Sequence, residues 1–468
     1  MKSTNFFNRV LAVLVLCICF LMASCGVEKE HVHVSFLTLS DTEVELEAGD
    51  IHVLECTVSP YNADNQRIIW STSDKSVATV KDGVVTAVKA GNAIVTAMAD
   101  DNGKTAKCTV TVTGDGGNAG GNNNDGGEES DIDMDSAVNL SWSGTANCYI
   151  VTKAGKYTFK AVMGNSSESV GNVASAKVLW ESFGTHKTLE VGDLVKDVSY
   201  KDGEITFKAT DKKGNAVIAA KDADGNILWS WHIWMTDQPQ EQEYYNDAGT
   251  MMDRNLGATS ATPGDVGALG LLYQWGRKDP FLGSSSISSG IEAKSTGTWP
   301  SAVSSNSTNG TIEYATAYPT TFIESNSNNC DWHYTGSSST DNTRWTTSDK
   351  SKSVYDPCPS GWRVPDGGSN GIWSKAGFDD TTYDITNEGI SFSISSPSKT
   401  WYPASGYRRG REGSLGDVGF SGYYWSASPS HSYAYSLFFY DVGYDVGYVD
   451  PSNDYDRALG LSVRCLQE

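Results

Sequence analysis

The sequence predicts a multi-domain protein built mainly from β-strands. Apolar and polar residues alternate over long stretches, and a period of two places every second side chain on one face of a strand. Turn-forming pairs such as Asp82-Gly83 and Asn102-Gly103 separate these stretches and predict hairpins. The chain has 468 residues, which is too many for one ordinary hydrophobic core. We therefore expect several domains.

Residues 1–24 have the pattern of a bacterial secretion signal. Lys2 and Arg9 precede an apolar run at residues 10–23. This run of roughly 14 residues is shorter than the ~20 that a transmembrane helix needs. It matches the apolar part of a signal peptide instead.

The sequence MASCG at residues 22–26 resembles the lipobox of bacterial lipoproteins. The resemblance implies that Cys25 is lipidated and becomes the mature N-terminus, and that residues 25–34 act as a tether. Glu28 and Glu30 resemble the acidic export tag of surface lipoproteins in Bacteroides-type bacteria. An ordinary signal peptide followed by an incidental cysteine is the alternative.

The composition restricts the partners of this chain. It carries 57 acidic and 35 basic residues, and its formal net charge of −22 opposes binding to nucleic acid or to anionic lipid. Only 20% of the residues are charged, which fits an extracellular β-protein rich in serine, threonine, asparagine and glycine. The six cysteines after Cys25 form no CxxC pair, so they are disulfide candidates rather than zinc ligands. We expect no cofactor and no metal.

Residues 35–113 alternate as the strands of a small β-sandwich. The string at residues 68–97 is similar to the bacterial Ig-like group 2 domain, and this resemblance implies a spacer or an adhesive stalk. Cys56 and Cys108 both fall on the inward face of predicted strands. They either form a bridge across the core or remain as two free thiols.

A linker and a second β-sandwich follow. Residues 114–135 are rich in glycine, asparagine and acidic residues, and such a segment cannot bury a core. Residues 136–237 alternate again, with turn signals at 213–215 and 224–226. The acidic residues at 222–226 also suggest a calcium loop. We favour a plain hairpin, because the acidic residue expected twelve positions along is missing.

Residues 238–468 predict an irregular α+β domain. Aromatic residues are frequent, charges are sparse, and serine- and glycine-rich loops are long. Leu269, Leu272 and Tyr273 have helical spacing, so we expect one short helix over residues 268–276.

Five motifs in this region resemble the Fibrobacter succinogenes major paralogous domain, which occurs in surface lipoproteins of Bacteroides-type bacteria. They are MDRNLGA (252–258), GLLYQWGRKDPF (270–281), DPCPSGWRVP (356–365), GYYWSAS (422–428) and SVRCLQE (462–468). The resemblance implies a C-type lectin-like fold for residues 238–468. It also implies a structural disulfide between Cys358 and Cys465.

No motif in the chain predicts catalysis. The sequence contains no GxSxG, HExxH, P-loop or dinucleotide-binding pattern, and its few histidines are scattered. One enzymatic alternative remains, because sulfatase-activating oxidases share the C-type lectin-like fold and need a reactive cysteine pair. The ending SVRC resembles their C-terminus.

Three stretches of the last domain predict a ligand-binding surface. The first combines Trp401-Tyr402 with the arginine-rich residues 406–411, the second is 423–425, and the third is the aromatic and aspartate-rich segment 438–456. Each stretch has an alternative interpretation. The arginine-rich residues could form a solvated loop without a ligand, and Trp425 could be buried in the core. The aspartates of 438–456 could form turns instead of binding calcium. The candidate ligand contacts are Tyr407, Arg408, Arg409, Arg411 and Trp425.

Together these patterns predict an outer-membrane lipoprotein, exposed at the cell surface, that binds a glycan or a protein without catalysis. A structural or accessory subunit of a fimbria or another surface assembly is the first alternative. The oxidase is the second. The oligomeric state is left open.

Overall fold

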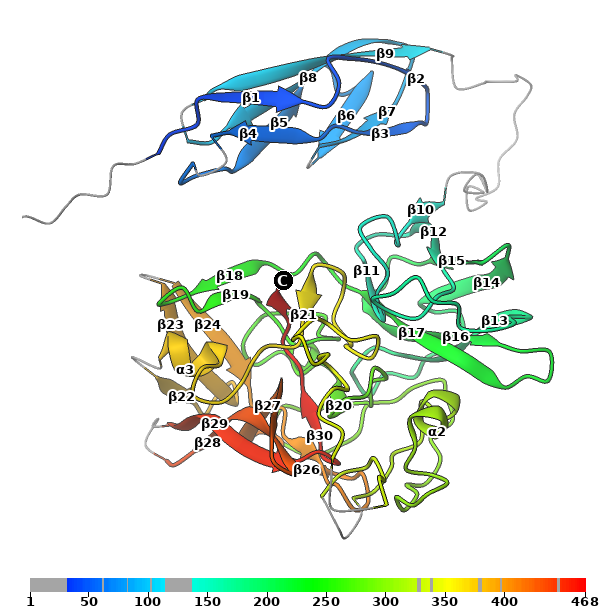
Figure 1. Ribbon diagram of the computed structural model, residues 1–468, viewed down its shortest axis with the longest axis vertical. Helices are drawn as coiled ribbons and strands as arrows, with labels where there is room; N and C mark the ends of the chain where they lie inside the picture. The colour runs from blue at the N-terminus through cyan, green and yellow to red at the C-terminus, as the bar shows by residue number, and fades with distance from the viewer. Residues whose placement is uncertain are drawn as a thin grey trace, which may run out of the picture. The chain divides into compact units, whose positions relative to one another are not determined.

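The computed structural model describes residues 32–60, 63–81, 83–101, 103–113, 137–325, 330–336, 340–377, 381–395, 398–443 and 447–468. They belong to two compact units, one within Met1–Glu129 and the other within Ser130–Glu468 (Figure 1). The secretion signal, Cys25 and the linker expected at 114–135 lie outside the described residues.

The first unit is the small β-sandwich expected for residues 35–113. Its strands are β1 (Phe36–Leu39), β2 (Glu43–Glu47), β3 (Ile51–Val53), β4 (Cys56–Ser59), β5 (Ile68–Thr72), β6 (Ala78–Lys81), β7 (Val84–Ala87), β8 (Gly91–Ala99) and β9 (Thr105–Thr113). They form sheets of order β2-β9-β8-β5, β3-β7-β6 and β1-β4. Both predicted hairpins are present, because β6 pairs with β7 and β8 with β9, although Asp82 and Asn102 lie outside the described residues.

The bridge considered between Cys56 and Cys108 is not formed, and both thiols are free. Cys56 pairs with Leu39 in the β1–β4 sheet, whereas Cys108 pairs with Val95 in the sheet that contains β8 and β9. The two side chains pack against the same apolar core from different sheets, where a thiol behaves as a small hydrophobic group. Burial raises the pKa of both thiols, so both stay protonated at neutral pH.

The second unit begins with the second β-sandwich. Its strands are β10 (Val138–Asn139), β11 (Cys148–Val151), β12 (Gly155–Lys160), β13 (Ser175–Ser182), β14 (Val195–Lys201), β15 (Glu204–Ala209), β16 (Gly214–Lys221) and β17 (Ile227–Met235). One sheet has the order β10-β12-β15-β14 and the other β11-β17-β16-β13. Aromatic rings fill the core between the sheets, and Phe159 lies 5.2 Å from Trp231 and 6.2 Å from Phe207, measured between ring centroids.

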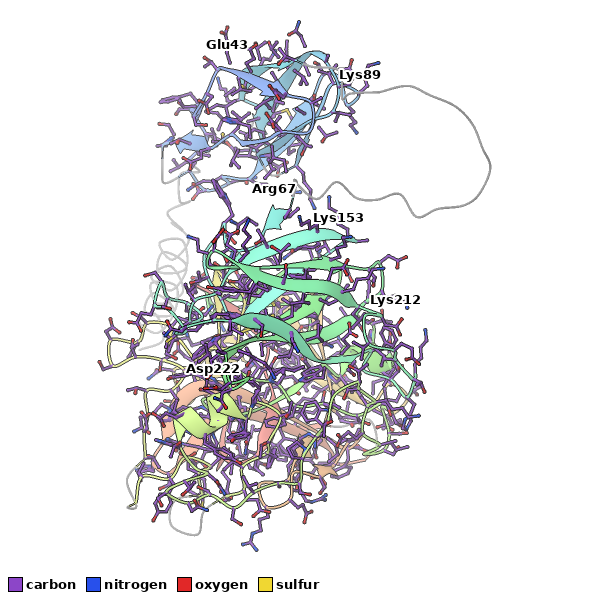
Figure 2. The ribbon with its side chains drawn as sticks, turned by 90° about the vertical axis from the view of Figure 1, so that its right-hand side faces the viewer. Glu43, Arg67, Lys89, Lys153, Lys212 and Asp222 are labelled. Atoms are coloured by element: carbon purple, nitrogen blue, oxygen red, sulfur yellow. A yellow bond between two sulfur atoms is a disulfide. The ribbon has the colours of Figure 1, made fainter. Side chains whose placement is uncertain are left out.

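The two turn signals of this sandwich have different outcomes. The turn at 224–226 joins β16 to β17 as a hairpin. The carboxylate of Asp222, which is labelled in Figure 2, accepts hydrogen bonds from the backbone N–H groups of Asp224 (3.0 Å) and Asn226 (2.8 Å). The prediction at 213–215 is wrong. Gly214 starts β16, and β15 and β16 belong to different sheets, so no hairpin connects them.

Strand β17 is buried on both faces. Trp229, Trp231 and Ile233 face the sandwich core, as their alternation predicts. The intervening residues, including His232 and Trp234, are also at most 2% exposed. Buried residues of the sandwich and of the terminal segment share a second core, which includes Cys148, Trp180, Val217, Trp234, Leu256 and Trp275. The segments 136–237 and 238–468, which we expected as separate domains, therefore form one compact unit.

A buried ion pair of the terminal segment contacts the sandwich at this junction. Lys278 and Asp279 of the terminal segment pair at 2.7 Å, and both side chains are almost fully buried. The Lys278 ammonium also donates to the Ser230 hydroxyl at 2.6 Å and lies 4.6 Å from the Trp229 ring of β17. The Trp234 indole N–H donates to the carbonyl of Ala258 at 2.9 Å. Because every charge has a partner, the junction can exclude water without leaving an isolated ion.

Within the described residues, the terminal segment forms three sheets, two short α-helices and one 3₁₀ turn. Its elements are β18 (Glu241–Tyr244), β19 (Gly249–Met252), η1 (Val266–Ala268), β20 (Leu272–Gln274), α2 (Ile312–Ala317), β21 (Trp362–Arg363), α3 (Ile372–Ala376), β22 (Thr382–Asp384), β23 (Gly389–Ser395), β24 (Ser398–Pro403), β25 (Tyr407–Arg408), β26 (Leu415–Gly416), β27 (Ser421–Ser430), β28 (Tyr433–Asp441), β29 (Gly447–Asp456), β30 (Gly460–Ser462) and β31 (Leu466–Gln467). The sheets have the orders β26-β25-β30-β27-β28-β29 with β20 beside β30, β18-β19-β31-β21, and β22-β23-β24. No described helix is long and apolar enough to cross a membrane.

The helix predicted over residues 268–276 is wrong. The segment starts with a single 3₁₀ turn, η1, and continues as strand β20. Gly270 separates the two with a φ of +73°, a conformation that stops a right-handed helix. Leu272 and Tyr273 are at most 1% exposed, because β20 pairs with β30 in the middle of the unit.

Buried arginines hold the long loops of the terminal segment. The Arg344 guanidinium forms a buried ion pair with Asp331, and its central carbon lies 4.8 Å from the Trp275 ring. Arg457 lies 4.4 Å from the same ring and donates to the carbonyls of Tyr433 (2.9 Å) and His431 (3.0 Å). Burial lowers the pKa of Arg457 to about 10, which leaves it charged at neutral pH. These side chains replace the backbone hydrogen bonds that irregular loops lack.

Candidate functional site

The three stretches singled out in the sequence contribute to one side of the seven-stranded sheet. Tyr407 lies on β25, Tyr423 on β27, and residues 438–456 include parts of β28 and β29. Tyr423 pairs directly with Phe438 across the antiparallel β27–β28 ladder, and direct partners point to the same side of a sheet. In Figure 1, β28 and β29 lie together in the seven-stranded sheet.

Rings on this side of the sheet form a continuous surface, which we call the aromatic face. It consists of Tyr407, Phe420, Tyr423, Phe438, Tyr440, Tyr448 and Tyr455. Neighbouring ring centroids lie between 4.9 and 6.0 Å apart, within the range of favourable aromatic packing. The rings therefore support one another as a preorganised surface.

The aromatic face is open to solvent at one end. Tyr423 is 6% exposed, whereas Tyr448 and Phe420 are 45% and 49% exposed. On the opposite side of the same sheet, Tyr424 and Phe439 are fully buried in a separate core. The Tyr424 side of the sheet thus belongs entirely to the core, whereas the other side is buried at Tyr423 and presents rings to water at Tyr448 and Phe420. A partner can cover these rings with a gain in free energy.

Carboxylates accompany the rings. The Tyr423 hydroxyl donates to Asp417 Oδ2 at 3.0 Å, and Asp450 pairs with Phe438 in the β28–β29 register. Burial raises the pKa of Tyr423 and of Tyr455, and Asp417 and Asp450 respectively add to these shifts. Both phenols stay protonated at neutral pH. The face therefore offers flat rings, hydroxyl donors and carboxylate acceptors together.

The predicted exposed arginine loop needs correction, because Arg408 is 6% exposed. Its guanidinium donates to the carbonyls of Leu282 (2.9 Å) and Gly413 (2.6 Å) and pairs with Glu292 at 2.8 Å. Burial lowers the pKa of Arg408, and Glu292 partly opposes this effect. The residue sits in strand β25 instead of a free loop, so its replacement would damage the fold.

The other predicted contacts separate into exposed and buried groups. Arg411 is exposed, and Arg409 is half-buried with its guanidinium 5.8 Å from the Tyr407 ring. Trp425 is fully buried, and its indole N–H donates to the Tyr273 carbonyl at 2.8 Å. Trp425 therefore belongs to the core and cannot contact a ligand. Tyr407 and Arg409 remain as candidates at one edge of the aromatic face, and the exposed Arg411 also remains a candidate.

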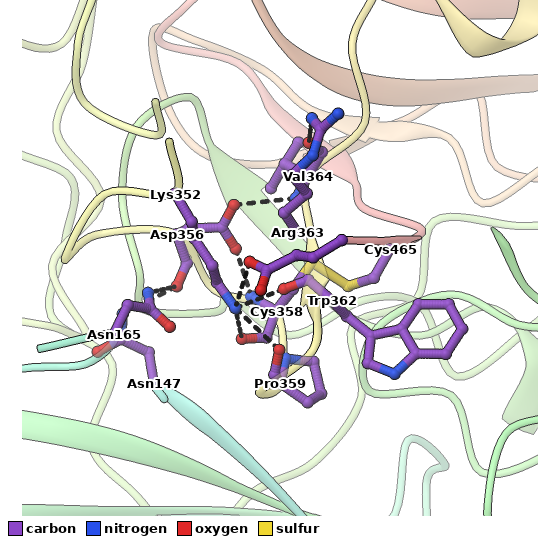
Figure 3. The surroundings of a disulfide bond; sticks show 11 residues. Asn147, Asn165, Lys352, Asp356, Cys358, Pro359, Trp362, Arg363, Val364 and Cys465 are labelled. Atoms are coloured by element: carbon purple, nitrogen blue, oxygen red, sulfur yellow. Dashed lines mark hydrogen bonds and ion pairs between the residues drawn. A yellow bond between two sulfur atoms is a disulfide. The ribbon is translucent and has the colours of Figure 1, made fainter. Parts of the chain in front are cut away.

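The disulfide between Cys358 and Cys465 is present, and both residues are fully buried (Figure 3). The Lys352 ammonium lies beside it and donates to the carbonyls of Cys358 (3.1 Å), Pro359 (2.8 Å) and Trp362. Burial lowers the pKa of Lys352. The lysine closes the loop that the disulfide anchors.

A buried carboxylate supports the same loop. Asp356 accepts hydrogen bonds from the backbone N–H groups of Cys358 (2.8 Å) and Val364 (2.9 Å) (Figure 3). Burial raises its pKa to about 6. Asn147 of the sandwich donates to the Asp356 carbonyl at 2.8 Å, so this loop also fastens the two segments together. Asp356 has a perturbed pKa, but it is enclosed by structural partners.

Most residues in the five motifs that resemble the Fibrobacter succinogenes major paralogous domain have structural roles. Asn255, Gln274, Trp275, Asp356, Trp425 and Arg464 are at most 1% exposed. Gln274, for example, donates to the carbonyls of Ile323 and Ala458, each at 2.7 Å. The motifs thus specify the framework, and ligand contacts must come from residues outside them or at their edges.

No metal centre is visible in the part of the chain that the structure describes. There, no three His, Cys, Asp or Glu side chains lie together as a metal site requires. Asp441, Asp450 and Asp454 lie in strands β28 and β29.

The sequence did not lead us to predict Trp142 as a candidate contact, although it is 77% exposed. Its position in the polar string SWSG was the available signal, because a tryptophan between small polar residues has no apolar neighbours to pack with.

Curated relatives match only a short part of this chain. The kappa-carrageenase of Pseudoalteromonas carrageenovora is 40% identical over 82 residues, 17% of this chain and 21% of that protein. The lacto-N-biosidase of Bifidobacterium bifidum is 44% identical over 89 residues, 19% of this chain and 8% of that protein. The chain therefore spans about a fifth or less of the length of these relatives.

Solved structures give only weak overall likeness. Domains 5–6 of the S-layer protein SbsC match with a TM-score of 0.16 and 14% identity, covering 44% of this chain and 98% of that one. The SGBP-B protein of the Bacteroides ovatus mixed-linkage glucan utilization locus, solved with a heptasaccharide, matches with a TM-score of 0.13 and 14% identity, covering 42% of this chain and 46% of that one. These scores are too low to transfer a property.

A family model gives the one specific assignment. The model of the bacterial Ig-like domain (group 2) matches residues 33–110. This range coincides with the first β-sandwich, and its length is close to that of the matches to the curated relatives. Residues 33–110 are therefore a bacterial Ig-like group 2 domain.

Proposed function

We propose that this protein is an exported surface lipoprotein whose second compact unit binds a neutral glycan, without catalysis. The aromatic face carries the proposal. Sugar rings have apolar faces that stack on aromatic side chains, and their hydroxyl groups donate to carboxylates. The carboxylates of Asp417 and Asp450 accept such hydroxyls and repel anionic sugars, so an uncharged chain is the favoured ligand.

The curated relatives support a role in glycan biology. Two are named as a kappa-carrageenase and a lacto-N-biosidase, and the segment shared with them has the length of the Ig-like domain. The shared segment covers 21% of one enzyme and 8% of the other, which is consistent with an accessory part of each. The Ig-like domain then acts here as a spacer that holds the binding unit away from the membrane.

The two alternatives receive less support. Strand β29 forms the outer edge of its sheet, but Pro451, Asp450 and Asp454 oppose the addition of another strand, which an assembly subunit would use. An oxidase needs a cysteine pair that its substrate can reach. Cys358 and Cys465 are both 0% exposed.

Removal of the half-buried Tyr440 ring and the exposed Tyr448 ring from the aromatic face should abolish most glycan binding. We expect the double variant Tyr440→Ala/Tyr448→Ala to bind neutral polysaccharides at least 10-fold more weakly, because each ring supplies stacking area and about 1.4 kcal/mol corresponds to a tenfold change. Affinity electrophoresis against mixed-linkage β-glucan, xylan, xyloglucan and mannan measures this. The probes are neutral, so charge effects do not contribute.

The matched control is Tyr318→Ala, because Tyr318 is 53% exposed and lies outside the aromatic face. It should bind like the parent protein. A parent that binds none of the four polysaccharides, or a double variant that binds as tightly as the parent, contradicts the proposal.

The anchor is tested separately. Cys25→Ala should move the exported protein from the detergent phase to the aqueous phase in Triton X-114 partition, because stable anchoring requires more than one acyl chain, which the lipidated cysteine supplies. Immunoblots of both phases measure the shift. Retention of the variant in the detergent phase would rule out Cys25 as the anchor.

A further inference from the structure

The second unit has a groove where the sandwich meets the terminal segment. Its volume is about 780 Å³. The sandwich contributes Ser141, Trp142, Gly144, Thr145, Lys160 and residues 165–167, and the terminal segment contributes residues 350–352, Ser360, Gly361, Arg363 and Glu468. Serine and threonine hydroxyls line much of it. The groove is separate from the aromatic face, with which it shares no residue.

Trp142 stands at the side of this groove with an unusually open ring. It is the only tryptophan among the described residues that is largely exposed, at 77%. A neighbouring hollow of about 340 Å³ also uses Trp142, together with Trp362, so the indole separates two concave surfaces. An indole placed between two hollows can stack on a ligand that occupies either of them.

The backbone that carries Trp142 is fixed. The Ser360 hydroxyl donates to the carbonyl of Ser143 at 2.6 Å and ties this turn to the terminal segment. Gly144 has a φ of +127°, and a Cβ added there would lie 2.5 Å from the Ser360 hydroxyl oxygen. The backbone of this turn is therefore held in place by the terminal segment.

The charge of the groove is opposite to that of the chain. Lys160, Lys350, Lys352 and Arg363 line it, against the single acidic residue Glu468, although the whole chain carries a formal charge of −22. Two of these cations are already engaged. Lys352 binds three carbonyls, and Arg363 pairs with Asp366 at 2.6 Å.

Lys160 and Lys350 are the cations available to a ligand. Both are exposed, and neither forms an ion pair with another described residue. Their ammonium groups come from the sandwich and from the terminal segment respectively, on one groove. Two free ammonium groups beside an open indole and several hydroxyls match a sugar that carries an anionic group.

We propose that this groove is a second glycan site, specific for an acidic sugar with a carboxylate or sulfate group. Trp142 stacks on the sugar ring, and Lys160 and Lys350 bind the anionic group. The inference extends the proposed function, because it assumes that the second unit binds glycans. The proposed site lies on a different surface from the aromatic face and would bind a ligand of different charge. The aromatic face carries Asp417 and Asp450, whereas the groove carries lysines.

The test uses the full chain and titration calorimetry with two acidic probes, oligogalacturonate and chondroitin sulfate oligosaccharides, and with neutral xylo-oligosaccharides. Trp142→Ala should weaken binding of at least one acidic probe 10-fold or more. Lys160→Ala/Lys350→Ala should weaken it similarly at low salt and flatten its salt dependence, because two ionic contacts are lost. Chondroitin sulfate carries both carboxylates and sulfates, so binding of chondroitin sulfate but not of oligogalacturonate would indicate a sulfate ligand, and binding of oligogalacturonate a carboxylate ligand.

The matched control is Lys153→Ala/Lys177→Ala, which removes two exposed lysines of the sandwich outside the groove. It should bind the acidic probes like the parent. Tyr440→Ala/Tyr448→Ala should also leave acidic binding unchanged while it loses neutral binding. That result would distinguish the two sites, so the proposal for the groove and the proposal for the aromatic face can be rejected independently.

Three results would overturn the inference. The first is that neither acidic probe binds more tightly than the neutral one, while the aromatic face still binds neutral glycans. The second is that Trp142→Ala binds the acidic probes like the parent. The third is that a synthetic peptide of residues 114–135 displaces the probes, because the groove would then hold the chain's own acidic segment.

Discussion

Replacement of both Cys358 and Cys465 by alanine is expected to lower the melting temperature of the second unit by roughly 10 °C. The disulfide closes a loop with a sequence separation of 107. On the chain-entropy model, a loop of this size stabilises the folded state by about 5 kcal/mol, because the cross-link restricts the unfolded chain. The loss should be large here, because the closed loop contains β22 to β30 and therefore most of the strand residues of the terminal segment.

Circular dichroism in the near ultraviolet measures this effect, because thirteen of the fourteen tryptophans follow residue 136 and report on the second unit. The matched control is Cys330→Ala, which removes a half-buried free thiol without opening a loop. It should melt within a few degrees of the parent. A double variant that melts together with this control would show that the disulfide is dispensable.

Replacement of His232 by glutamine is expected to make the second unit more resistant to acid. His232 is fully enclosed at the junction, and its Nε2–H donates to Asn215 Oδ1 at 2.8 Å. Its Nδ1 is buried without a hydrogen-bond partner among the described residues, so a proton added there would find no acceptor. Burial accordingly lowers the pKa of His232 to about 3.

The direction of this pH effect follows from the protons that the folded and unfolded states bind. Between pH 6.5, the ordinary pKa of the unfolded side chain, and about pH 3, the unfolded state binds a proton that the folded state does not. Stability from His232 is therefore present above pH 6.5 and is lost as the pH falls, by about 1.4 kcal/mol for each pH unit. Asp356 has the opposite effect on stability between its ordinary pKa and about pH 6. The pH dependence of the parent protein alone would therefore hide the contribution of His232.

The difference between parent and variant isolates the histidine. Urea unfolding at pH 7, 6, 5 and 4 should show the parent losing stability relative to His232→Gln at each step, even if the variant is less stable at pH 7. The exposed His186→Gln is the matched control, because folding does not remove its ring from water. Parallel curves for parent and His232→Gln would contradict the assignment.

The sequence predicted strands better than it predicted what covers them. The alternating pattern correctly predicted the inward face of β17. The other face carries Ser230, His232 and Trp234, and this mixture of polar and apolar residues predicts a face exposed to solvent. That face is buried by the terminal segment, and a long-range contact leaves no periodic signal. The error at residues 268–276 has the same origin, because burial on all sides gives an apolar run that fits either a helix or a strand.

The candidate site was predicted in pieces. Composition alone identified the aromatic stretches, yet only the register of β27 and β28 decides that Tyr423 and Phe438 share a side. Trp425 lies on the same side as Tyr423, but the core that contains Trp275 buries it completely. Arg408 illustrates the limit. A basic residue between glycines suggests an exposed loop, whereas the folded chain uses its five N–H donors to satisfy buried carbonyls and Glu292.

The doubly buried β17 has a consequence for how this architecture is inherited. A recombination event near residue 237 would join the sandwich to a new C-terminal sequence and leave Trp180, Val217 and Trp234 without their cover. The product would carry an indole-rich patch that promotes aggregation. By contrast, a break within 114–135 exposes no known core residue. Gene shuffling should therefore exchange the Ig-like domain freely and transmit residues 137–468 as a single block.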